Sequence, residues 1–158
     1  MPADGYKASQ WHHESNIITT LKHTNRICQI QLKGFSCSEL KWILPVMQKQ
    51  FLALTSHDIE FSKHSFQGAM AVLPKAFLGG SAQHLRSCNL WAVEFLGIWK
   101  LLLTANHLVT LYLWHIPHSM YTSLEGMAAC LSTMPNLKSL SIGFQSPQSL
   151  HNRPDHPN

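Results

Sequence analysis

Eleven histidines are the residues of this chain best suited to acid–base or metal chemistry. An imidazole titrates near neutral pH, and its ring nitrogens bind zinc. His115 and His118 lie three residues apart, but Pro117 between them is incompatible with the helical H-E-x-x-H motif of a zinc protease. No carboxylate or cysteine lies at a fixed ligand spacing from this pair. We interpret the histidines as surface or packing residues and expect no metal and no cofactor.

The carboxylates are few and scattered, and Asp58 and Glu60 form the one close pair. They alternate along an expected strand, so both point to the same side, where they could serve a basic partner or acid–base catalysis. The chain has no G-x-S-x-G motif, and the double glycine of "FLGGSAQHL" is typical of a turn. Neither an oxyanion hole nor a metal is indicated beside the carboxylates. We therefore predict that the protein is not an enzyme.

Two large aromatic residues stand out in "LVTLYLWHIP", residues 108–117. The leucines of this stretch follow an L-x-x-L-x-L pattern, and Tyr112 and Trp114 alternate with them. A period of two predicts a strand whose leucines face a core. Tyr112 and Trp114 are then expected on the opposite side.

The same apolar pattern occurs five times along the chain. Its first residues are Ile27, Leu54, Leu85, Leu108 and Leu137, which gives spacings of 27, 31, 23 and 29 residues. A leucine-rich repeat has about 20–29 residues and an L-x-x-L-x-L core. Since one such strand cannot bury its apolar side alone, neighbouring strands must stack in parallel. We predict an α/β fold, a short solenoid of about five leucine-rich repeats with a curved parallel sheet on its concave side.

The segments between these strands should cover the other side of the core as helices and irregular turns. We expect helices within 14–24, 37–50, 93–105 and 123–134, and a helical turn that Gly79 and Gly80 end. Ser38 and Ser123 are the expected N-caps, and Pro45 shortens or kinks the second helix. The repeat domain spans 14–145, between a flexible segment 1–13 and a disordered tail 146–158.

His57 occupies the middle apolar position of the second motif. An unpaired imidazole in a core is costly, so we expect His57 to be accommodated there by a local hydrogen bond.

The repeat pattern also predicts a binding surface on the concave side. Equivalent residues of neighbouring strands lie about 4.8 Å apart. One column then reads Gln31, Asp58, Asn89, Tyr112 and Ser141, and the next reads Lys33, Glu60, Trp91, Trp114 and Gly143. Exposed aromatic residues rimmed by charge are typical of a protein-binding hot spot. The predicted partner-binding residues are Asp58, Glu60, Asn89, Trp91, Tyr112 and Trp114. The alternative is that a C-terminal extension or a loop covers the rings.

Composition narrows the classes of partner. Hydrophobic residues make up 45% of the chain and charged residues 13%. The formal net charge is +4, but no three basic residues are consecutive in the sequence. These values argue against nucleic-acid binding. No stretch approaches the roughly 18 apolar residues of a membrane span, and the first ten residues lack the basic-then-apolar order that is typical of a signal peptide. The four cysteines form no C-x-x-C pair, and we expect reduced thiols and a cytoplasmic or nuclear protein.

Four longer stretches resemble a known family: "SNIITTLKHTNRICQIQL", "LPKAFLGGSAQHL", "LLLTANHLVTLYLWHIPHS" and "MAACLSTMPNLKSLSIGFQSP". They are similar to the leucine-rich-repeat region of the large F-box protein family of mushroom-forming (basidiomycete) fungi, from about Asn16 to Pro147. The resemblance implies that an F-box docks on a Skp1–cullin ubiquitin ligase while the repeats hold the target. About 25 residues precede the first expected strand, too few for the three-helix F-box.

The resemblance implies a non-catalytic protein–protein interaction module, the substrate-recognition repeats of a truncated F-box receptor. Its partner would be an unknown protein on the concave face, and Skp1–cullin would bind only if an F-box exists upstream. The alternative is a free-standing repeat protein, or a non-functional gene fragment, without a ligase role.

Overall fold

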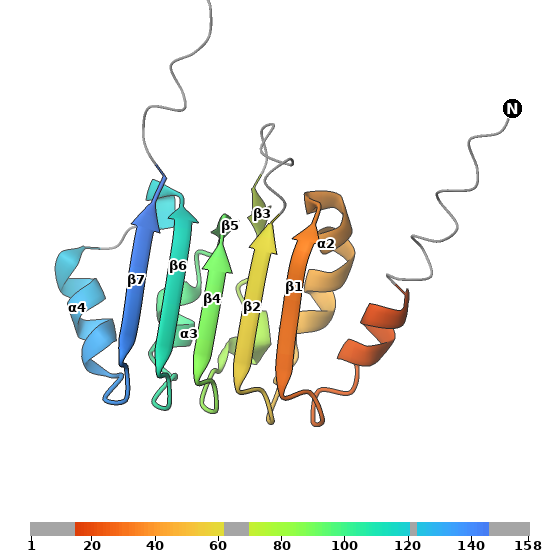
Figure 1. Ribbon diagram of the computed structural model, residues 1–158, viewed down its shortest axis with the longest axis horizontal. Coiled ribbons are helices and arrows are strands. Elements are labelled where there is room, and N and C mark those ends of the chain that lie inside the picture. Colours follow the sequence, from red (N-terminus) through yellow and green to blue (C-terminus); the bar gives the residue numbers. More distant parts are fainter. Residues whose placement is uncertain (1–14, 62–69, 121–122, 146–158) are drawn as a thin grey trace, which may run out of the picture.

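The computed structural model describes residues 15–61, 70–120 and 123–145, and it has an α/β fold. At its centre lies a five-stranded parallel sheet of order β1-β2-β4-β6-β7, so neighbouring strands follow one another along the chain (Figure 1). The strands are β1 (Gln29–Phe35), β2 (Ser56–Phe61), β4 (Ser87–Trp91), β6 (Thr110–Ile116) and β7 (Ser139–Phe144). The predicted segments 1–13 and 146–158 lie outside the described residues.

Each of the five sequence motifs contributes one strand, and their middle positions align across the sheet. The register pairs Ile30 with His57, His57 with Cys88, Cys88 with Leu111, and Leu111 with Leu140.

Just before each of β2, β4, β6 and β7, a backbone amide donates a hydrogen bond to the segment that precedes the neighbouring strand. The amide of Thr55 donates to the carbonyl of Cys28 at 2.8 Å, and the amide of Arg86 donates to the carbonyl of Thr55 at 2.7 Å. The amides of Val109 and Lys138 continue this series at 2.8 and 2.9 Å. The four connections therefore enter the sheet with one shared geometry.

The helical segments cover one face of the sheet and leave the other face open (Figure 1). They are α2 (Cys37–Ile43), α3 (Ile98–Leu102), α4 (Leu124–Ser132) and the 3-10 helices η1 (Leu44–Gln48), η3 (Phe77–Gly80) and η4 (His118–Met120). A further helix, over 15–21, lies beside β1 at the edge of the sheet (Figure 1). The leucines at alternate strand positions point toward these helices, and Leu111 and Leu113 are almost fully buried. Together they form one hydrophobic core that extends from Leu21 to Met134.

The N-cap of α2 differs from the prediction. Ser36, and not Ser38, caps this helix: its Oγ accepts from the amide of Glu39, whose carboxylate accepts from the amide of Ser36 at 2.6 Å. This reciprocal arrangement is a capping box, which satisfies two amides that the first helical turn leaves unpaired. Pro45 lies at the start of η1, where the chain changes from α to 3-10 geometry, as its position predicts.

The remaining helices follow the prediction in type more closely than in length. Ser123 caps α4 as predicted, and its Oγ accepts from the amide of Gly126 at 3.1 Å. Helix α3 has only five residues, because Gly97 stands at its N-cap and not within it. The sequence pattern did not predict the two-residue strands β3 (Ala71–Val72) and β5 (Val93–Glu94), which pair in a second small parallel sheet.

His57 does not have the hydrogen bond predicted for it. The side chain is 1% exposed, and within the described residues neither ring nitrogen has a partner. Its ring contacts Phe77 edge to face at a centroid distance of 5.1 Å. Packing against an aromatic ring takes the place of the expected hydrogen bond, and burial lowers the pKa of His57 to about 4. A neutral imidazole therefore lies in the core.

Candidate functional site: the open face of the sheet

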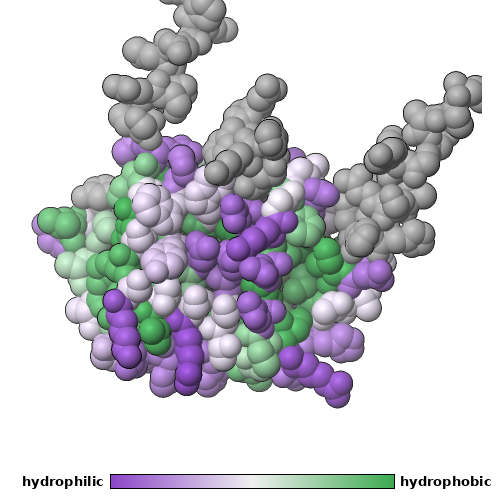
Figure 2. All heavy atoms as spheres, in the orientation of Figure 1, coloured by the Kyte–Doolittle hydropathy of each residue, from purple (hydrophilic) through white to green (hydrophobic). Residues whose placement is uncertain are grey.

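The open face is the side of the five strands that points away from the helices, toward the viewer in Figure 1. The register brings the predicted columns together. Gln31, Asp58, Asn89, Tyr112 and Ser141 are consecutive partners in one column, and Lys33, Glu60, Trp91 and Trp114 in the next. Gly143, predicted to end the second column, is not the register partner of Trp114, because the pairing of β6 with β7 shifts between Leu113 and Ile116. Hydrophilic side chains gather in the middle of this face (Figure 2).

Asp58 is the centre of a polar cluster on β1, β2 and β4. Its Oδ2 accepts from Lys33 Nζ at 2.8 Å and from Gln31 Nε2 at 3.3 Å, and its Oδ1 accepts from Asn89 Nδ2 at 2.8 Å. Its side chain is only 16% exposed. The carboxylate also raises the pKa of the Lys33 ammonium, first by the hydrogen bond and then by its charge. Asp58 therefore organises the face and has little accessible surface for a partner.

Glu60 differs from Asp58 in both exposure and contacts. Its side chain is 41% exposed, and Oε2 lies 3.9 Å from Lys33 Nζ. That separation is too long for a hydrogen bond. Among the predicted acidic residues, Glu60 is the one whose carboxylate remains accessible.

The aromatic residues occupy β4 and β6, beside the polar cluster. Tyr112 and Trp114 are 36% and 45% exposed. The Tyr112 hydroxyl is 2.9 Å from Ser139 Oγ on the next strand. Trp91 is half-buried, packs against the core, and contacts His115 edge to face at a centroid distance of 5.0 Å. Trp91 is therefore partly structural, whereas Tyr112 and Trp114 present the larger accessible area.

Gly143 makes room for the Trp114 ring. A Cβ at position 143 would lie 2.5 Å from Trp114 Cε3, closer than any real contact. The indole thus lies directly against the backbone of β7. A side chain at position 143 would have to displace it.

A repeated backbone feature ends the regular part of three strands. Gly34, Ala92 and His115 all have positive φ, at 73°, 58° and 53°, and each follows a residue of the Lys33–Glu60–Trp91–Trp114 column. The pairing of β6 with β7 shifts register between Leu113 and Ile116, so Trp114 and His115 are both exposed.

His115 therefore joins the open face, although strict alternation predicts the opposite side. No sequence signal reveals this, because left-handed backbone is the preference of glycine and neither Ala92 nor His115 is glycine.

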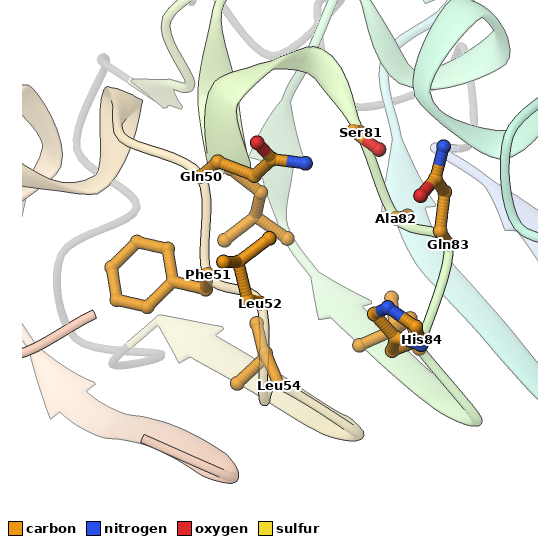
Figure 3. Close-up of a pocket in the computed structure, with 10 residues that line it drawn as sticks. Gln50, Phe51, Leu52, Leu54, Ser81, Ala82, Gln83 and His84 are labelled. Atoms are coloured by element: carbon orange, nitrogen blue, oxygen red, sulfur yellow. The ribbon is translucent and has the colours of Figure 1, made fainter. Parts of the chain in front are cut away.

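The described hollows are small or shallow. One, of about 10 Å³, lies between segment 50–54 and segment 81–85 (Figure 3), which is room for about one water molecule. A shallow depression of about 460 Å³ is lined by Gln83, His84, Leu103, Thr104, Asn106 and His107. Within the described ranges, no three His, Cys, Asp or Glu side chains are grouped to hold a metal ion, and no helix is long and apolar enough to cross a membrane.

Comparisons with family models, with curated proteins and with solved structures find no match to this chain.

Proposed function

We propose that the chain is a short leucine-rich-repeat solenoid in the cytoplasm or nucleus whose open face binds another protein. The observation that carries this proposal is the pair Tyr112 and Trp114, which are exposed on a sheet face that the helices leave uncovered. Large aromatic side chains dominate the binding energy of protein interfaces. Here they lie on a strand in the interior of the sheet, which is a rigid support.

The polar cluster around Asp58 supports the same role. Its hydrogen bonds hold Gln31, Lys33 and Asn89 in fixed positions beside the aromatic residues. A surface that is ordered before binding loses less side-chain entropy on association. The open face therefore combines an aromatic area with a pre-ordered polar rim, as in hot spots surrounded by polar contacts.

The resemblance to the repeats of F-box proteins supports a more specific proposal. In that reading the open face holds the target of a ubiquitin ligase receptor. The proposed role in a ubiquitin ligase is supported by the resemblance alone. The proposed binding of a protein is supported by the exposed aromatic residues.

A matched pair of tryptophan substitutions tests the binding role. Trp42 on α2 is 61% exposed, but it lies on the helical side of the molecule. Affinity enrichment with the intact chain should capture a partner that Trp114→Ala loses and Trp42→Ala retains. Circular dichroism verifies that both variants fold. Equal capture by wild type and Trp114→Ala, or loss with Trp42→Ala alone, would contradict the proposal.

A further inference from the structure

We propose that the row formed by Glu60, Trp91 and Trp114 binds an arginine side chain of the partner protein, an inference that rests on the proposed role of the open face. The three residues are consecutive partners on β2, β4 and β6. Neighbouring strands lie about 4.8 Å apart, so a carboxylate and two indoles share one short row. An arginine side chain offers chemistry that suits both kinds of group.

The chemistry of guanidinium fits both kinds of group in the row. It is planar, stacks on an indole face through cation–π attraction, and donates in a bidentate manner to a carboxylate. A lysine ammonium is a point charge that cannot stack in this way. The row therefore favours arginine over lysine.

Glu60 is the accessible anion of the row because Asp58 holds the nearest cation. Lys33 Nζ lies 2.8 Å from Asp58 and 3.9 Å from Glu60, so its short contact is with Asp58. With 41% of its side chain exposed, Glu60 can accept two parallel hydrogen bonds from a guanidinium.

Both indoles are held in place, and each keeps part of its surface exposed. Trp114 lies against Gly143 on β7 and remains 45% exposed. Trp91 is half-buried and contacts His115. A ring that is already fixed loses little entropy when a cation stacks on it.

Charge favours a basic partner at this position. The whole chain has a formal net charge of +4. The described strands, however, place one basic residue, Lys33, and two acidic residues, Asp58 and Glu60, on the open face. The face is thus locally negative within a positive molecule, which favours a cationic side chain at this position.

The test uses a minimal probe, acetyl-Gly-Arg-Gly-amide, with the citrulline peptide as its neutral isostere. The intact chain, labelled with ¹⁵N, is titrated while the indole N–H resonances of its five tryptophans are followed. We expect the arginine peptide to shift the resonances of Trp91 and Trp114 in a saturable manner. The resonance of Trp42 should stay in place, and the citrulline peptide should bind at least about threefold more weakly, as expected for loss of an exposed charge pair and a cation–π contact.

Two glutamate variants identify the anion. Glu60→Gln should weaken binding of the arginine peptide about threefold to fivefold. Glu125→Gln removes the same charge from α4, away from the open face, and should leave the affinity unchanged. Equal shifts with the citrulline peptide, no shift with the arginine peptide, or equal affinity of Glu60→Gln and wild type would overturn the proposal.

Failure of this inference is distinguishable from failure of the proposed function. If a captured partner depends on Trp114 but not on Glu60, and the two peptides behave alike, the open face binds protein without recognising arginine. If Trp114→Ala does not affect capture, the proposed function itself fails, whatever the peptides show.

Discussion

The two neighbouring carboxylates of the second motif have different roles in the structure. Asp58 accepts from three donors, whereas Glu60 keeps an exposed carboxylate. The sequence predicts that both side chains point to one side, because residues 58 and 60 have the same parity in a strand. It does not predict which carboxylate Lys33 contacts, since that depends on side-chain rotamers and on Gln31 and Asn89 in neighbouring strands.

His57 gives the protein a stability that depends on pH. Burial lowers its pKa from 6.5 to about 4, and the negative charge of Asp58 opposes this shift only partly. Between these two values the unfolded chain binds more protons than the folded one, so the free energy of unfolding falls as the pH drops. Above pH 6.5 the contribution of His57 is constant. The total loss through this window is about 3 kcal/mol, at about 1.4 kcal/mol per pH unit.

Urea denaturation at about pH 7 and about pH 4.5 measures this effect. His57→Leu should remove it, and should also stabilise the protein at pH 7 by about 1–3 kcal/mol, because two unpaired buried nitrogens disappear. His107→Leu at an exposed position is the control and should retain the wild-type pH dependence. The same pH dependence in His57→Leu and wild type would show that other groups cause it.

Two serines near the start of α2, Ser36 and Ser38, are both candidates for its N-cap. Both lie near the start of the apolar face of the helix, and the apolar spacing alone favours Ser38 as the N-cap. Glu39 lies three residues after Ser36, which is the spacing of a capping box, so a readable signal existed. Ser36→Ala should therefore destabilise the protein by about 1 kcal/mol, and Ser38→Ala by less than about 0.5 kcal/mol. Thermal and urea unfolding compare the two variants, and equal losses would contradict the assigned cap.

The main strands could be predicted from the sequence because each one combines the L-x-x-L-x-L spacing with alternation over several residues. The strands β3 and β5 could not, since two residues are too few to show a period. The adjacency of Trp91 and Trp114 follows from the register and was predicted. The exposure of His115 follows from a left-handed residue within a strand, which depends on the tertiary pairing of β6 with β7.

At the scale of the whole molecule, burial depends on where a residue lies in the series of strands. Leu111 and Leu140 occupy the same motif position and are direct partners on β6 and β7. Leu111 is 0% exposed, whereas Leu140 is 44% exposed, because β7 is the last strand of the described sheet and no further strand pairs with its outer edge. A leucine stabilises a fold in proportion to the apolar area it buries. Leucines at the same motif position therefore contribute unequally to the free energy of unfolding.

The difference in burial predicts that the same leucine-to-alanine substitution lowers the free energy of unfolding by different amounts at the two positions. Leu111→Ala should lower the free energy of unfolding by about 3 kcal/mol, since it removes buried methyl groups and leaves a cavity. Leu140→Ala should lower it by less than about 1 kcal/mol, because much of that side chain is already in water. Urea unfolding of both variants, followed by tryptophan fluorescence at several protein concentrations, measures the two losses. A Leu140→Ala loss as large as that of Leu111→Ala, growing with protein concentration, would show that a second copy covers β7 in solution.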